Sequence, residues 1–225
     1  LIRISHINRF KNSSNINLPS DITKRIIDKY KDKKKYKTNI MINLGSSQII
    51  SGLDYWEKSM QDCDVVQFNL HEAKRLFSVN QTVTPPNLLS IIHWLQEKKI
   101  TALITLSKFG AIGSYKDGKD GLIFAWPIET NDFIDPTGAG DAFSAGMASI
   151  LCEKPSFSFA DFFQAINIGK FWATYACTKI GGCGDCPTMD TINDFITITS
   201  QQSPTEVHNE TNLLQTLRLL EKALT

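Results

Sequence analysis

Short apolar runs alternate with longer stretches in which apolar residues recur every three or four positions. This pattern predicts strands separated by helices. Strands are expected at 39–44, 64–68 and 100–106. Helices are expected at 21–31, 55–60, 70–77 and 87–99, and Ser20 is expected to be the N-cap of the first. The alternation predicts an α/β fold with a mainly parallel central sheet and helices on both faces, in three layers.

The second half of the chain adds a hairpin and two strongly apolar helices. Two strands, 112–116 and 122–125, flank an Asp-Gly turn, and 128–134 reads as a further strand. The elements expected after it are helices at 139–151, 159–179 and 188–197, a polar linker at 200–209 and an amphipathic helix at 212–220. The last helix offers an apolar face to the body of the protein or to a second copy in a homodimer.

The composition excludes several classes of partner. Among 225 residues, 24 Lys and Arg balance 23 Asp and Glu, so neither a nucleic acid nor an anionic membrane is expected as a partner. The sequence has no signal-peptide pattern and no apolar run of the ~18 residues that a membrane span needs, so a cytoplasmic protein is expected. Five cysteines are an odd number, which argues against a full disulfide framework.

Two local patterns leave alternatives open. Lys31 to Lys37 form a basic cluster that is either a phosphate patch or the solvated end of the preceding helix. Cys183 and Cys186 are spaced as in a metal or redox site, but a zinc site needs a second pair of ligands, so a turn beside a nucleotide is the competing interpretation.

The densest chemical pattern is the stretch 135–141, Asp-Pro-Thr-Gly-Ala-Gly-Asp, which precedes an apolar helix. Gly138 and Gly140 allow a tight turn and close approach of a ligand to the backbone, and the helix N-terminus favours an anion. Asp141 either complements the helix dipole or acts as a base beside a bound phosphate.

Two further motifs follow predicted strands. Asn69 and Glu72 are spaced either as a helix capping box or as a pair in which Glu72 holds Mg²⁺ through water. Thr105 to Gly113 form a glycine-containing turn after the strand 100–106. Because ligands of such sheets bind beyond the carboxyl ends of the strands, these motifs are expected to converge on one site.

The stretch 135–143 resembles the C-terminal signature of the ribokinase-like (PfkB) family of sugar and nucleoside kinases. The resemblance implies that Asp141 is the catalytic base and that Gly138, Ala139 and Gly140 form the anion hole for the transferred phosphoryl group. Asn69-x-x-Glu72 resembles the motif that governs magnesium and phosphate binding in this family. It implies ATP and Mg²⁺ as cofactors.

Three more positions carry the resemblance. Thr105, Ser107 and Gly110 resemble the family's Thr-x-Gly-x-x-Gly nucleotide loop, with Ser107 where glycine is usual. Asn167 lies about where the family places a residue beside the adenine ring, although a core-facing asparagine fits equally well. Asp135 resembles a residue that lies near a monovalent cation such as K⁺ in some members.

The resemblance divides the chain into a nucleotide-binding core at 39–198, a remnant of the substrate-side half at 1–38, and a linker with a terminal helix at 199–225. The family's acidic sugar ligand, its Gly-Gly motif and its β lid are not found before residue 39, so a weak or inactive enzyme is expected from this chain alone. The implied reaction is transfer of the ATP γ-phosphoryl group to a hydroxymethyl group of a sugar or nucleoside. The stretch 43–47, Asn-Leu-Gly-Ser-Ser, resembles adenosine-kinase-like members. The alternative is a non-catalytic nucleotide-binding protein.

Overall fold

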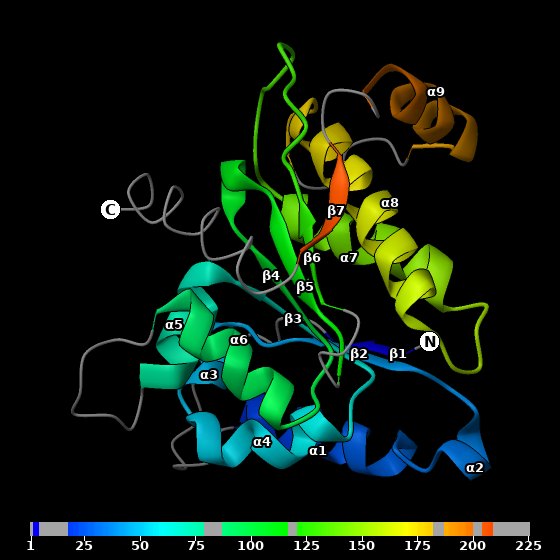
Figure 1. Cartoon of the computed structure of the whole chain (residues 1–225). Helices are drawn as coiled ribbons and strands as arrows, with labels where there is room; N and C mark the ends of the chain where they lie inside the picture. Colours follow the sequence, from blue (N-terminus) through cyan, green and yellow to red (C-terminus); the bar gives the residue numbers. More distant parts are fainter. Residues whose placement is uncertain are drawn as a thin grey trace. The chain divides into compact units, whose positions relative to one another are not determined.

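The computed structural model describes residues 2–4, 18–78, 87–116, 121–181, 187–199 and 204–208 (Figure 1). The described residues form two compact units. The first unit comprises Leu1–Ile104 and Ser114–Lys119, and the second comprises Thr105–Gly113 and Asp120–Thr225. The chain therefore enters the second unit at Thr105, returns to the first at Ser114 and enters the second again at Asp120.

The first unit contains strands in the order β1-β2-β3-β4, of which β1 and β2, and β2 and β3, pair in parallel. Their bounds are Ile2–Ile4 for β1, Ile40–Asn43 for β2, Val65–Asn69 for β3 and Ala102–Thr105 for β4. β2 is buried at every position and β3 at every position except the last, as expected for strands covered on both faces. These strands confirm the predicted ones, and β1 adds a strand in a segment that the sequence pattern left unassigned.

Helices connect the strands of the first unit. They are α1 (Leu18–Tyr30), α2 (Lys33–Tyr36), α3 (Ser46–Ile49), α4 (Leu53–Gln61), α5 (Leu70–Ser78) and α6 (Leu88–Glu97). α5 packs against β3 and α6, and the apolar side chains of α6 at Ile91, Ile92 and Leu95 are fully buried. The prediction of Ser20 as an N-cap is wrong, because α1 begins two residues earlier and proline is tolerated in a first helical turn. Ser20 is buried, and its hydroxyl lies 2.9 Å from that of Ser51.

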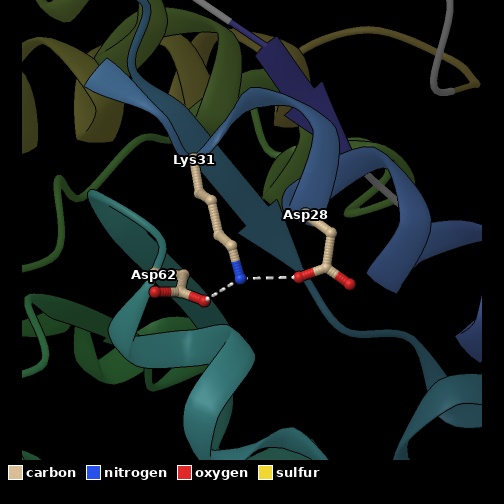
Figure 2. A network of polar contacts seen from close by, with 3 residues as sticks. All are labelled: Asp28, Lys31 and Asp62. Atoms are coloured by element: carbon tan, nitrogen blue, oxygen red, sulfur yellow. Dashed lines mark hydrogen bonds and ion pairs between the residues drawn. The ribbon is translucent and has the colours of Figure 1, made fainter. Parts of the chain in front are cut away.

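The basic end of α1 is bonded to the end of α4 (Figure 2). Lys31 Nζ donates to Asp28 Oδ1 at 2.8 Å and to Asp62 Oδ2 at 3.2 Å. The hydrogen bonds to Asp28 and then Asp62 raise the pKa of Lys31. This contact favours the solvated-helix-end interpretation of Lys31, and a part-exposed pair of this kind adds little to stability.

The second unit combines strands, in the order β5-β6-β7, with three long helices. Its elements are η1 (Ser107–Phe109), β5 (Ala111–Ser114), β6 (Leu122–Ala125), α7 (Ala139–Leu151), α8 (Phe159–Cys177), α9 (Met189–Thr199) and β7 (Thr205–His208). Ser114, the last residue of β5, belongs to the first unit. β6 and β7 are antiparallel, with Leu122 opposite His208 and Ala125 opposite Thr205. The described strands thus include an antiparallel pair beside the parallel pairs, which makes the sheet mixed.

α7 and α8 lie side by side at very short range (Figure 1). A Cβ atom at Gly146 of α7 would lie 2.8 Å from Gly169 Cα of α8, and one at Gly169 would lie 2.5 Å from Phe143 Cδ1. Real Cβ atoms do not approach so closely, so both positions require glycine. The contact fixes α7, and with it the turn at its N-terminus, against α8.

Two predictions for the second unit are wrong. Residues 128–134 form no strand; a turn at 131–132 interrupts them, and the backbone N–H groups of Ile134 and Asp135 both donate to the carbonyl of Cys177. The polar stretch 200–209 is more than a linker, because β7 lies within it and pairs with β6. The predicted helix 212–220 and the pair Cys183 and Cys186 lie outside the described residues.

No helix in the described part of the chain combines the length and apolar character needed to cross a membrane.

Candidate functional site

The turn that opens α7 is built around Gly138. This residue is the N-cap and has φ +79° and ψ −4°, a left-handed conformation that side chains other than glycine adopt at a cost. Ala139 N donates to Pro136 O at 3.1 Å, and Ala142 N donates to Gly138 O at 2.8 Å. The predicted glycine turn is therefore present, and it leads directly into the positive end of the α7 dipole.

Gly140 differs from Gly146, the other glycine of α7. It lies in the first turn and is exposed, and apart from its neighbours in the chain and the backbone of its own helix, no described atom lies within 4 Å of the position that a Cβ would take. Glycine in a helix costs about 1 kcal/mol relative to alanine, and packing gives no reason to keep it here. Asp141 follows, also exposed and in the first turn, where its carboxylate suits the helix dipole. This part of the helix is thus an accessible backbone beside one acid.

Asp135 holds the turn to the end of α8. Its Oδ1 accepts the N–H of Thr137 at 2.9 Å, and its Oδ2 accepts the N–H of Gly181 at 3.0 Å. The hydrogen bonds from Thr137, and then the one from Gly181, lower the pKa of this carboxyl. These contacts give Asp135 a positioning role in the turn, and its role near a monovalent cation stays a prediction.

The loop after β4 has the shape of a sharp glycine-dependent turn. Ser107 has φ +55° and Gly110 has φ +99°. A Cβ at Gly110 would collide with the backbone carbonyl of Ala125 in β6, while Leu106 N donates to Gly110 O at 2.8 Å. The left-handed backbone at Ser107 gives a physical reason why glycine suits this position. Thr105 ends β4 immediately before the loop.

Asn167 belongs to a polar chain that links α8 to β7. Lys170 Nζ donates to Thr205 Oγ1 at 2.9 Å, and Thr205 Oγ1 donates to Asn167 Oδ1 at 2.9 Å. Lys170 is only 5% exposed, and burial lowers its pKa to about 8. The core-facing alternative for Asn167 is thus observed in part, with a side chain as partner, and its position beside adenine stays a prediction. Lys170 was missed, although a single lysine in a largely apolar helix is its signal in the sequence.

In the first unit, Asn69 and Glu72 form a reciprocal pair at the start of α5. Asn69 N donates to Glu72 Oε2 at 2.9 Å, and Glu72 N donates to Asn69 Oδ1 at 2.8 Å. The capping-box interpretation is therefore confirmed, and Glu72 is buried with 6% exposure. Its role in magnesium binding stays a prediction, as does the convergence of this pair with the motifs of the second unit.

The described residues contain no group of three or more His, Cys, Asp or Glu side chains that could hold a metal ion directly. A metal that uses one carboxylate together with water or phosphate ligands requires no such group.

The elements and their order define an α/β protein with the ribokinase-like fold. The crystal structure of aminoimidazole riboside kinase from Salmonella enterica, complexed with aminoimidazole riboside and an ATP analog, matches with a TM-score of 0.60 at 20% identity. The match covers 76% of this chain and 56% of that chain. The model of the pfkB family carbohydrate kinases matches residues 5–189, so the chain belongs to this family. The resemblance drawn from the motif at 135–143 is confirmed.

Sequence relatives and a further solved structure support the same family. A ribokinase of Haemophilus influenzae is 28% identical over 164 residues, which are 72% of this chain and 49% of that protein. A fructokinase from Vibrio cholerae, with fructose, ADP and calcium ion bound, matches with a TM-score of 0.55 at 18% identity over 70% of this chain and 50% of that chain. The chain thus spans half or less of the length of the curated relatives that it matches, with shares of 49%, 32% and 40%.

Proposed function

We propose that this protein transfers the γ-phosphoryl group of ATP to a hydroxymethyl group of a sugar or nucleoside. The observation that carries the proposal is the N-terminus of α7. Gly138 turns the backbone into the helix, Gly140 leaves it accessible, and Asp141 stands exposed in the same turn. An anion-binding backbone beside a carboxylate provides the two groups that phosphoryl transfer to an alcohol needs.

In this reaction the acceptor hydroxyl oxygen attacks the γ-phosphorus, and the bond from that phosphorus to the β,γ-bridging oxygen breaks. Asp141 takes the hydroxyl proton as the new bond forms. The positive end of α7, at Gly138 to Asp141, stabilises the charge on the transferred group. The close packing of α7 on α8 and the two hydrogen bonds of Asp135 keep this turn in place.

The nucleotide and its metal are assigned to the remaining motifs. We assign the ATP side to the loop Thr105, Ser107 and Gly110 and to Asn167, with K⁺ near Asp135. Mg²⁺ is assigned to Glu72 through water, since a carboxylate at the carboxyl end of a strand suits an ion that keeps most of its hydration shell. When bound, the ion neutralises charge on the phosphates.

The acceptor class is supported by the molecules named in related structures. One neighbour carries aminoimidazole riboside and an ATP analog, and another carries fructose and ADP. Both acceptors are polyols with a ribose-like or hexose skeleton, so we propose a sugar or a nucleoside as the acceptor here. The nucleoside alternative agrees with the stretch 43–47.

Replacing Asp141 by Asn tests the proposal. The variant should lose turnover by orders of magnitude while MgATP still raises the unfolding midpoint, because the amide cannot accept the proton. Asp132→Asn, at an exposed turn outside the motif, is the matched control. Equal turnover in the Asp141 variant and the wild-type chain would refute the assignment, and MgATP binding without any wild-type turnover would favour a non-catalytic protein.

A further inference from the structure

The amide of Asn43 carries a buried acceptor that nothing in the described structure satisfies. Asn43 ends β2 and is 6% exposed, and no described residue donates a hydrogen bond to its Oδ1. Buried polar atoms nearly always have a partner, and an unsatisfied one destabilises the folded state. An acceptor that persists in this state therefore points to a partner other than the described residues.

The strand register places Asn43 beside the predicted metal motif. Asn43 pairs with Gln67 in the parallel β2–β3 ladder, and Asn69 is two residues further along β3. Because side chains alternate along a strand, the three share one face of the sheet, and Asn43 and Asn69 lie about 8 Å apart between Cα atoms. Both strands end here, at the edge where parallel sheets bind ligands.

The chemistry of the atom restricts its partner. An amide carbonyl oxygen accepts hydrogen bonds or coordinates a cation, so it cannot bind an unprotonated phosphate oxygen or a carboxylate. Glu72, the anion nearest along the motif, favours a cation at this edge. A magnesium ion that keeps its waters presents strongly polarised O–H donors and is attracted by Glu72.

We propose that Asn43 Oδ1 accepts a hydrogen bond from a water of the Mg²⁺ hydration shell, which makes Asn43 a positioning residue for the magnesium–nucleotide complex. The inference rests on the proposed function, because it assumes that MgATP binds here. Asn43 would complement Glu72, to which Mg²⁺ is assigned and whose Oε2 accepts the N–H of Asn69.

The test measures the unfolding midpoint of the whole chain in EDTA and at fixed ATP with increasing Mg²⁺. Asn43→Leu, which is close in size, should match or exceed the wild-type midpoint in EDTA, because it removes an unsatisfied acceptor. Its half-maximal Mg²⁺ concentration should rise about tenfold, as expected for one lost hydrogen bond to a metal-bound water. Asn43→Asp, which keeps the acceptor and adds charge, should need no more Mg²⁺ than the wild type.

Ser114→Ala is the matched control. Ser114 is 2% exposed, and its Oγ also finds no partner among the described residues, so the change removes a similar atom in the same unit. It should leave the Mg²⁺ requirement unchanged. An unchanged requirement in Asn43→Leu, or a clear fall of its midpoint in EDTA, would overturn the inference, because the partner would then be a structural water or another part of the chain. A wild-type chain without any MgATP response would instead reject the proposed function itself.

Discussion

Lys170 gives the most quantitative prediction, because a charged group lies in the core of the second unit. Its side chain is 5% exposed, and burial lowers its pKa from 10.5 to about 8. Below pH 8 the lysine is charged in both the folded and the unfolded chain, so folding removes a charge from water. Between pH 8 and 10.5 the unfolded chain keeps a proton that the folded chain has lost, and stability therefore rises with pH.

The magnitude follows from the two pKa values. The difference of about 2.5 pH units (10.5 − 8) sets an upper limit of roughly 3.5 kcal/mol, since each unit is worth about 1.4 kcal/mol. Relaxation of the protein and water penetration around the buried charge reduce this value, and we expect about 1–2 kcal/mol. Lys170→Met removes the titration and also the hydrogen bond to Thr205, which offsets its gain at pH 7 by about 1 kcal/mol.

Urea unfolding of wild type and Lys170→Met from pH 7 to 10.5 measures the effect. The stability difference between the two proteins should shift by about 1–2 kcal/mol in favour of the wild type as the pH rises. Tyr55, whose pKa burial raises to about 12, and Cys177 also titrate at alkaline pH, but they are common to both proteins and cancel. Lys108→Met removes an exposed charge from the same unit and should give parallel curves. Parallel curves for Lys170→Met as well would refute the reasoning.

Three further predictions concern the backbone around the site. Ser107→Gly should raise the free energy of unfolding by about 1 kcal/mol, because φ is +55° there, and Ser107→Ala should give no such gain in urea unfolding. Ser158→Ala should lower the free energy of unfolding by about 1 kcal/mol, because α8 loses its cap. Hydrogen bonds from Ser158 and then Lys154 lower the pKa of Asp161 to about 2. The loss of stability caused by Asp161→Asn should therefore fade as the pH falls from 3.8 towards 2. Gly146→Ala should lower the thermal midpoint through a cost of about 1–3 kcal/mol, whereas Gly140→Ala should raise it slightly and weaken the response to MgATP.

Local signals in the sequence predicted the elements that carry the site. The helix 139–151 was predicted with the bounds that α7 has, since a glycine turn precedes it and its small apolar residues suit a buried helix. The capping alternative for Asn69 and Glu72 was equally visible, because a residue that accepts an N–H three positions away needs no distant partner. Such features depend only on neighbours in the chain.

The errors arose where a distant partner decides the structure. The β-branched residues at 128–134 favour a strand, but the backbone of Ile134 bonds to Cys177 and no strand forms. The stretch 200–209 reads as a linker because its sequence is polar, and only pairing with β6 makes β7 a strand. The chain from Lys170 through Thr205 to Asn167 depends on that pairing, so it too was beyond a local pattern.

Three glycines in the signature region differ in whether the fold itself explains why glycine is needed there. Gly138 is required by a left-handed backbone, and Gly146 by the 2.8 Å approach to Gly169. Gly140 has neither requirement, since its helical backbone suits any residue and the space around its Cβ position is empty in the described structure. A helix keeps such a glycine at a cost of about 1 kcal/mol. The cost is offset if a ligand takes the place of the side chain, so the argument for a bound phosphoryl group is strongest at the glycine that the fold itself does not need.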